Sequence, residues 1–188
     1  MTVFHAALAL ESHGGTPSFL NVTGQVRGAI AASGIGNGIV AVMSPHTTCS
    51  VYYDEWAHDT VEDGSDFLQH DLNRVLGLIC PDQTRFPPSD GYSYPGTRHF
   101  EEVESWPSAE EYLPGGDRSA LLNADAHLKA SIVGSSRSST ANSGSASPAT
   151  SSSSTGTATG PAHGPAGSRS SASERTNPCH GMQIIAFI

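Results

Sequence analysis

The sequence predicts one domain that mixes short β-strands with helices, followed by a long segment of low complexity. Two runs rich in strand-forming residues, 38–43 and 48–53, are separated by a proline, which predicts two strands joined by a sharp corner. Apolar residues recur at helical spacing in 65–78 and again in 121–133. We therefore expect the first 134 residues to fold around a core of both strands and helices.

The N-terminal elements follow from local signals. Residues 3–11 alternate loosely between apolar and polar side chains and predict a first strand. A turn then leads to 18–22, which could be the second strand of a hairpin. Thr23 is a suitable N-cap for a helix that runs to about Ser33, and Gly34 is a suitable stop. We expect this helix to contribute packing.

The middle of the chain combines two predicted helices with an irregular insert. Ser65 is a suitable N-cap for the helix at 65–78, whose core-facing stripe would comprise Leu68, Leu72, Val75 and Ile79. Six prolines and six aromatic residues in 80–116 predict a long irregular excursion held in place by its aromatic side chains. The helix at 121–133 would place its apolar side chains on one buried face, formed by Leu121, Ala124, Leu128 and Ile132.

The last third of the chain has a different composition. From Ser135 to Pro178 there is no Val, Ile, Leu, Met or aromatic residue, so this segment cannot bury enough apolar surface to order itself. Residues 181–188 are apolar again and predict a strand, which either returns to a sheet or remains an aggregation-prone edge. The predicted organisation is a domain at 1–134, a disordered Ser/Gly/Ala-rich segment at 135–178 and a terminal strand remnant at 179–188.

Charge and cysteine content exclude several classes of protein. Up to Gly134 the chain has 17 acidic and 6 basic residues, so nucleic acids and anionic membranes are not expected partners. Acidic residues in such number either attract metal ions and cationic groups or simply form a solvated surface. The three cysteines are widely spaced without a CxxC motif, which indicates neither a disulfide framework nor a cysteine zinc site. The apolar run at 6–10 is too short for a signal or membrane segment, and we expect a cytoplasmic protein.

The predicted corner between the two strands contains the motif Pro45-His46-Thr47-Thr48. A histidine at a rigid corner, followed by two hydroxyl groups, can act as a metal ligand or a general base. The alternative is a surface histidine without a function. Farther along, His127 lies at the margin of the buried face of its helix, where a histidine often serves only as a polar neighbour of the core.

The PHTT motif, the helix containing Asp71 and the stretch NADAHLKASIVGSS at 123–136 together resemble the YjbQ family, a group of small proteins of the secondary thiamine-phosphate synthase type. The resemblance spans roughly residues 1–136, and the insert before the AHLKAS helix is similar to that of larger-loop members. It implies an α+β fold with two small, mostly antiparallel sheets packed as a sandwich with flanking helices, assembled as a homotrimer. The C-terminus departs from the family pattern, because the Ser/Gly tract replaces a hairpin and an Arg-rich final strand is absent.

The resemblance also implies a site. His46, His99 and His127 would converge on one cleft and bind a divalent metal, with zinc the first choice. The residues expected to take part in catalysis are His46, Asp71 and His127. The residues expected to bind a small phosphorylated substrate are Thr47, Thr48, Asn123 and Lys129.

Three functions remain open at this point. The first joins a pyrimidine methyl diphosphate to a thiazole phosphate and releases pyrophosphate, which requires cations to stabilise the leaving group. The second is metal-dependent hydrolysis with Asp71 or Glu55 as the base. The third is a non-catalytic trimeric protein that binds a metal or another ligand.

Overall fold

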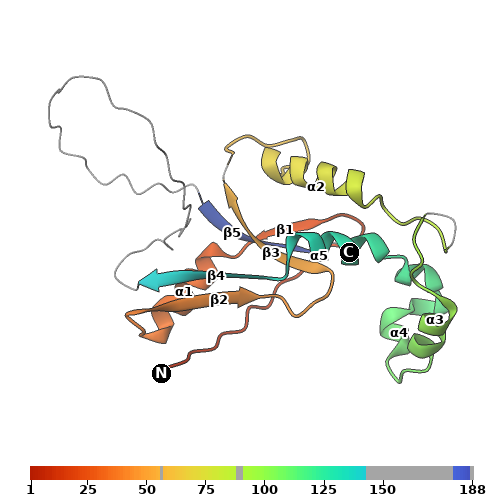
Figure 1. Cartoon of the computed structure of the whole chain (residues 1–188), viewed down its shortest axis with the longest axis horizontal. Helices are drawn as coiled ribbons and strands as arrows, with labels where there is room; N and C mark the ends of the chain where they lie inside the picture. Colours follow the sequence, from red (N-terminus) through yellow and green to blue (C-terminus); the bar gives the residue numbers. More distant parts are fainter. Residues whose placement is uncertain (56, 88–90, 143–179, 187–188) are drawn as a thin grey trace, which may run out of the picture.

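The computed structural model describes residues 1–55, 57–87, 91–142 and 180–186. In these residues five strands, five α-helices and two short 3-10 helices follow one another along the chain (Figure 1). Their order is β1 (Ser18–Asn21), α1 (Thr23–Ser33), β2 (Asn37–Met43), β3 (Cys49–Glu55), α2 (Phe67–Ile79), α3 (Thr97–Glu104), α4 (Ala109–Tyr112), η1 (Pro114–Gly116), η2 (Arg118–Leu121), α5 (Ala124–Val133), β4 (Ser136–Asn142) and β5 (His180–Ala186).

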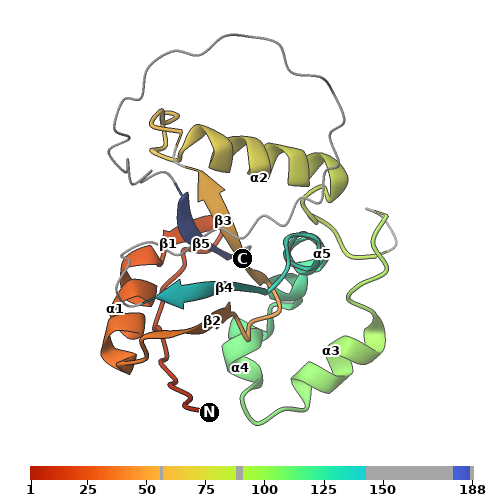
Figure 2. The same ribbon diagram turned by 60° about the vertical axis from the view of Figure 1, so that its left-hand side comes forward.

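The strands form two antiparallel sheets, which confirms the predicted α+β class. One sheet has the order β1-β5-β3 and the other pairs β2 with β4. Figures 1 and 2 show α2 on one side of the three-stranded sheet and the two-stranded sheet on the other. The two sheets share a core, in which Val51 of β3 and Ile184 of β5 are buried and Val40 and Val42 of β2 pack beside them.

The N-terminal prediction was partly wrong. Residues 1–12 form no strand, although Leu8 and Leu10 still pack against the core. β1 lies where the second strand was predicted, but its partner is β5 rather than the preceding segment. Pairing with a strand more than 160 residues away replaces the expected hairpin, and no local signal could indicate this exchange.

The C-terminal strand was predicted as a strand, and β5 confirms it by returning to the middle of the three-stranded sheet. The domain boundary at residue 134 was placed too early. Ser136–Asn142 forms β4, which pairs with β2 along all of its seven residues, because backbone hydrogen bonding does not require apolar side chains. The rest of the segment predicted to be disordered, 143–178, lies outside the described residues.

The helix boundaries are close to those predicted, whereas the caps differ. Val22, not Thr23, is the N-cap of α1, and Gly34 ends this helix in the left-handed conformation, as expected. Asp66, not Ser65, caps α2: its carboxylate accepts hydrogen bonds from the backbone N–H groups of Leu68 and Ala57. Aspartate can accept both bonds at once, which explains the shift of the cap by one residue.

The expected buried stripe of α2 was also wrong in part. Leu76 is buried and Leu72 packs against the same core cluster, but Leu68, Val75 and Ile79 are exposed. The helix therefore contacts the three-stranded sheet along a narrow line. A second apolar face, to which Phe67 and Leu78 also belong, points away from this contact.

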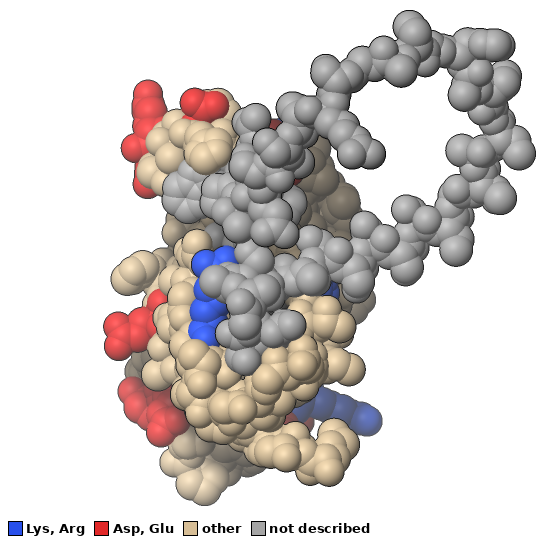
Figure 3. Space-filling model, turned by 90° about the vertical axis from the view of Figure 1, so that its left-hand side faces the viewer, with Lys and Arg blue, Asp and Glu red and all other residues tan. Residues whose placement is uncertain are grey.

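The insert at 80–116 is more regular than expected. It contains α3, α4 and η1, and together with η2 these helices enclose a small separate core formed by Phe100, Val103, Leu113 and Leu121. Figures 1 and 2 show them beside one end of α5. No described helix is long and apolar enough to cross a membrane. Figure 3 shows one end of the molecule, where acidic side chains lie along the left edge and the few basic ones lie near the middle and at the lower right.

Candidate functional site: a cluster of histidine and tyrosine side chains

The corner between β2 and β3 presents His46 with one ring nitrogen held. Thr48 is buried, and its hydroxyl Oγ1 lies 2.9 Å from Nδ1 of His46. The backbone N–H of Thr48 also points to Nδ1, at 3.4 Å. The backbone of the corner is fixed as well, because the N–H of Cys49 donates to the carbonyl of His46. A buried neighbour therefore orients an imidazole that is itself exposed.

The insert contributes a second hydrogen-bonded pair, formed by Tyr94 and His99. The hydroxyl of Tyr94 lies 2.9 Å from Nε2 of His99, which belongs to α3, and the centroids of the two rings are 4.8 Å apart. Burial raises the pKa of Tyr94, so its phenol group stays protonated at neutral pH. The same ring makes an edge-to-face contact with His127 of α5, at 5.6 Å between centroids. Tyr94 thus contacts two histidines from different helices.

The pKa of His127 is influenced by the other two histidines of the cluster. Burial lowers its pKa, and the nearby rings of His46 and His99 lower it further. A hydrogen bond with the backbone of Thr47 and the charge of Asp125 act in the opposite direction but do not reverse the shift. The imidazole of His127 is therefore neutral at pH 7, with a lone pair that can accept a proton or bind an electrophile.

The donor types fit zinc, because three imidazoles with one nitrogen held by a protein partner are typical of metal ligands. However, no group of three or more His, Cys, Asp or Glu side chains within the described ranges is placed to hold a metal ion. Zinc binding by His46, His99 and His127 would require a closer approach of the three rings and stays a prediction.

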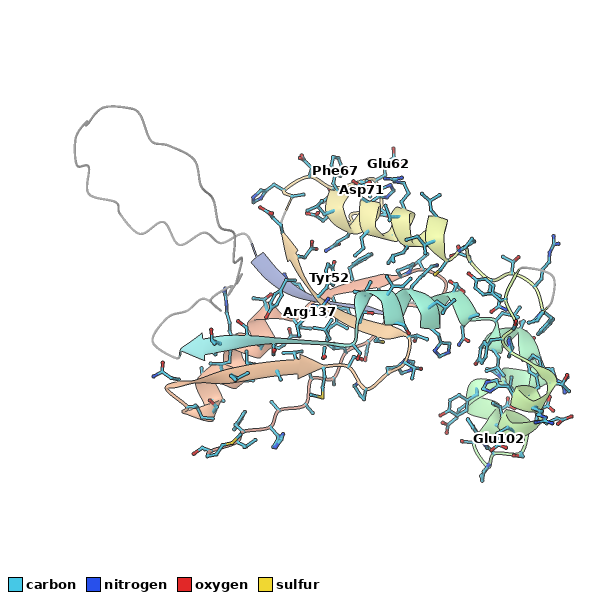
Figure 4. All side chains as sticks on the ribbon, viewed as in Figure 1. Tyr52, Glu62, Phe67, Asp71, Glu102 and Arg137 are labelled. Atoms are coloured by element: carbon cyan, nitrogen blue, oxygen red, sulfur yellow. The ribbon has the colours of Figure 1, made fainter. Side chains whose placement is uncertain are left out.

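Asp71 is not brought to this cluster. It lies on α2, where its exposed carboxylate pairs with Arg74 at 3.4 Å. Figure 4 shows it on the side of α2 that faces away from the sheets, together with Phe67 and Glu62. Asn123 is nearer to the cluster, since its carbonyl accepts the backbone N–H of His127. Its side-chain oxygen is buried without a hydrogen-bond partner among the described residues.

Lys129 has a different environment from the one expected of a substrate ligand. Its side chain is only 5% exposed, and Nζ lies 2.7 Å from Asp82 and 2.8 Å from Asp125. Burial lowers the pKa of Lys129, but the hydrogen bonds with the two carboxylates outweigh burial and the pKa is raised. The charge of this lysine is therefore already neutralised within the protein.

The buried face of α5 explains this difference. Leu128 and Ile132 are exposed, contrary to the prediction, whereas Ala126, Lys129 and Ala130 are buried. Small alanine side chains let α5 approach β3 closely, and buried Ser50 of β3 donates a hydrogen bond to the carbonyl of Ala130. Of the four residues predicted from helical spacing to be buried, Leu121 and Ala124 are buried, so the prediction was wrong only for Leu128 and Ile132.

Two residues of this region were not singled out from the sequence. Tyr94 was counted only among the aromatic residues of the insert, and its spacing of five residues from His99 is the one local signal of their contact. Gln83, which is buried and hydrogen-bonded to both Tyr94 and Ala124, gives no signal in the sequence.

The fold and the cluster define a small α+β protein in which three histidines and a tyrosine from separate elements lie together, with the pKa of His127 lowered by burial. Its family follows from sequence: the chain belongs to the family described as UPF0047 protein YjbQ-like, whose sequence model matches residues 8–150. This match confirms the resemblance based on the PHTT and AHLKAS motifs.

Several solved structures are similar to the chain but distant in sequence. A YjbQ/UPF0047-family protein from Clostridium acetobutylicum is 18% identical with a TM-score of 0.49, covering 91% of this chain and 81% of its own. A conserved hypothetical protein from Thermus thermophilus is 19% identical with a TM-score of 0.46, covering 92% and 82%. A YjbQ-like protein of unknown function from Sulfolobus solfataricus is 15% identical with a TM-score of 0.46, covering 90% and 76%. A comparison with curated proteins found no significant match.

Proposed function

We propose that the cluster of His46, Tyr94, His99 and His127 performs acid–base chemistry on a small phosphorylated molecule. The observation that supports this most directly is the position of Tyr94, whose hydroxyl meets His99 while its ring packs against His127. A protonated phenol and a neutral imidazole side by side provide a proton donor and a proton acceptor at neutral pH.

The family resemblance favours one reaction, the synthesis of thiamine phosphate. The thiazole nitrogen would form the new C–N bond while the C–O bond to the diphosphate breaks. In this scheme the Tyr94–His99 pair protonates the leaving diphosphate and His127 holds the pyrimidine through its free lone pair. Thr47, which is exposed beside His46, would donate a hydrogen bond to the phosphate of the thiazole, whereas the buried hydroxyl of Thr48 stays bonded to His46.

Hydrolysis of a single phosphorylated substrate is the alternative, and a specific observation favours it. Departure of a diphosphate requires positive charge, yet Lys129 is held by Asp82 and Asp125, and Arg118 pairs with Glu104. Attack by a water molecule activated by neutral His127 would require less positive charge at the site than departure of a diphosphate. A bound divalent metal would supply the missing charge in either reaction.

Product analysis decides between the two reactions. The purified chain is incubated with both substrates and with each one alone, and pyrophosphate, inorganic phosphate and the joined product are measured. Pyrophosphate that appears only with both substrates supports the synthase, whereas phosphate released from one substrate supports the hydrolase. Absence of turnover with tight ligand binding would instead support the third possibility, a non-catalytic binding protein.

Matched histidine variants test the site itself. We expect His127→Gln and His46→Gln to abolish turnover without unfolding the protein. His70→Gln is the control, because His70 is an exposed histidine on α2. Equal activity in all three variants would contradict the proposed site.

Metal binding has a separate test. Elemental analysis of the purified chain should find about one zinc or other divalent ion per chain, and His46→Ala and His127→Ala should each remove it while leaving the far-ultraviolet circular dichroism unchanged. Unchanged metal content in both variants would contradict zinc binding by the three histidines and leave the acid–base proposal in its metal-free form.

We also propose that the chain assembles as a homotrimer. This proposal is supported by the apolar residues that α2 leaves exposed, above all Leu78 and Ile79. Light scattering coupled to size exclusion should give three times the mass of the chain. Leu78→Glu should lower that mass, whereas a monomeric mass for the unmodified chain would contradict the proposal.

A further inference from the structure

Gln83 is a buried amide that connects two parts of the chain. It follows α2 and is only 7% exposed. Its Oε1 accepts the backbone N–H of Ala124 at 2.8 Å, and its Nε2 donates to the carbonyl of Tyr94 at 2.6 Å. Its own backbone N–H points to a carboxylate oxygen of Asp125, at 3.3 Å. These three hydrogen bonds link Gln83 to α5 and to the segment that contains Tyr94.

The bond to Ala124 has a structural role at the start of α5. The first N–H groups of a helix have no acceptor within the helix and require one from elsewhere. Asn123, the N-cap of α5, makes no side-chain hydrogen bond to them. Gln83, 41 residues earlier in the chain, supplies the acceptor instead.

The ion bridge beside Gln83 reinforces the same connection. Nζ of Lys129 joins Asp82, the neighbour of Gln83, to Asp125 in the first turn of α5. Tyr92 adds a hydrogen bond from its hydroxyl to the carbonyl of Pro81. Asp82 and Gln83 are thus bonded to α5, Pro81 is bonded to Tyr92, and the amide of Gln83 extends the connection to Tyr94.

We propose that Gln83, supported by the Asp82–Lys129–Asp125 bridge, is a positioning residue that holds Tyr94 against His99 and His127. The geometry is direct: a short hydrogen bond fixes the carbonyl of Tyr94, and the ring of the same residue makes both contacts with the histidines. This role also assigns Lys129 to the support of the cluster rather than to the substrate. The inference rests on the same cluster as the proposed function.

Two variants of Gln83 separate positioning from simple stabilisation. Gln83→Glu keeps the oxygen that caps Ala124, where the positive end of the helix dipole favours a carboxylate, but it cannot donate to Tyr94. Gln83→Leu loses both bonds. We expect α5 to keep its capped start in the glutamate variant, while Tyr94 is released in both variants.

The readouts do not depend on turnover. Diethyl pyrocarbonate modifies accessible neutral imidazoles, and peptide mass spectrometry gives the rate at each histidine. We expect His99 and His127 to react severalfold faster in Gln83→Glu than in the unmodified chain, and the nuclear Overhauser effects between the rings of Tyr94 and His127 to disappear. Circular dichroism and hydrogen exchange in β3 should remain unchanged. A purely structural role of Gln83 would instead predict that both change.

Gln69→Leu is the matched control. Among the described residues, Gln69 also makes side-chain hydrogen bonds, one to Asp54 and one within the capping box of α2, but none to Tyr94 or α5. It should leave the reactivity of His99 and His127 unchanged. Lys129→Met should resemble Gln83→Glu, and Lys129→Arg should restore most of the protection because it keeps the charge.

Unchanged rates at both histidines in folded Gln83→Glu would overturn the inference. If Gln83→Leu does not fold, the glutamate variant alone decides. A chain without any turnover, but with faster modification in Gln83→Glu, would refute the proposed function and support the positioning role, so the two failures can be distinguished.

Discussion

The C-terminal strand β5 should be indispensable, although a low-complexity stretch separates it from the rest of the domain. β5 lies between β1 and β3 and pairs with both. Its residue Ile184 is 7% exposed and belongs to the core cluster that contains Val22, Val26 and Val51. We therefore predict that Ile184→Ala destabilises the whole domain, not only the end of the chain.

The magnitude follows from burial. Truncating a buried isoleucine to alanine typically costs about 2–5 kcal/mol. Domains are stable by only about 5–15 kcal/mol, so the loss is a large share of the total. The matched control is Ile132→Ala on α5, where the side chain is 54% exposed and the expected loss is within about 0.5 kcal/mol.

Urea unfolding followed by circular dichroism measures both variants. With an m-value of about 2 kcal/mol/M, a loss of about 3 kcal/mol lowers the midpoint by about 1.5 M. Equal midpoints for Ile184→Ala and Ile132→Ala would refute the reasoning, because β5 would then not pack in the core. The same reasoning predicts that a chain ending at residue 134 cannot fold, since it lacks both β4 and β5.

Three further predictions concern local interactions. Asp66→Ala should cost about 1–2 kcal/mol in urea unfolding because Asp66 caps α2, whereas Ser65→Ala should cost within about 0.5 kcal/mol; equal losses would contradict the assignment of the cap. Ser50→Ala should cost about 1 kcal/mol, measured the same way, because its buried hydroxyl donates to Ala130, and no loss would show that this bond does not stabilise the contact of α5 with β3. The folded state depresses the pKa of His127 below its ordinary value of 6.5, so the stability contributed by its neutral form should be full above pH 6.5 and fall as the pH drops below it. Thermal unfolding between pH 8 and 5 should show a smaller loss of stability for His127→Gln than for the unmodified chain. Identical pH profiles for the two proteins would contradict the shift.

The strands around the corner show what local sequence can predict. β2 and β3 begin and end within two residues of the predicted runs, because proline and β-branched residues act on their own neighbourhood. Their pairing is not local. β2 pairs with β4 and β3 with β5, so the corner passes from one sheet to the other, which depends on strands about 100 and 130 residues away.

The site shows the same limit. The three histidines were predicted through the family motifs, and the pKa of His127 reflects the other two rings. Tyr94 and Gln83 were not, because their contacts arise only when the insert packs against α5. Lys129 was assigned to the substrate through the family resemblance alone. Its burial depends on Asp82, 47 residues earlier, and on the small side chains that bring α5 close to β3.

The ion pairs of the basic residues near the histidines affect which reaction the site can carry out. Three basic residues are nearest in sequence to the histidines, and the structure neutralises Lys129 with two carboxylates and Arg118 with Glu104. Arg98 is the remaining one, and it forms no ion pair with any described residue. A departing diphosphate would therefore depend on Arg98 together with protonated imidazoles, a bound metal or a neighbouring subunit. Because His127 is neutral at pH 7, its own contribution of charge is small. Under the proposed function, we therefore expect a substrate with a single phosphate to react more readily than one with a diphosphate leaving group.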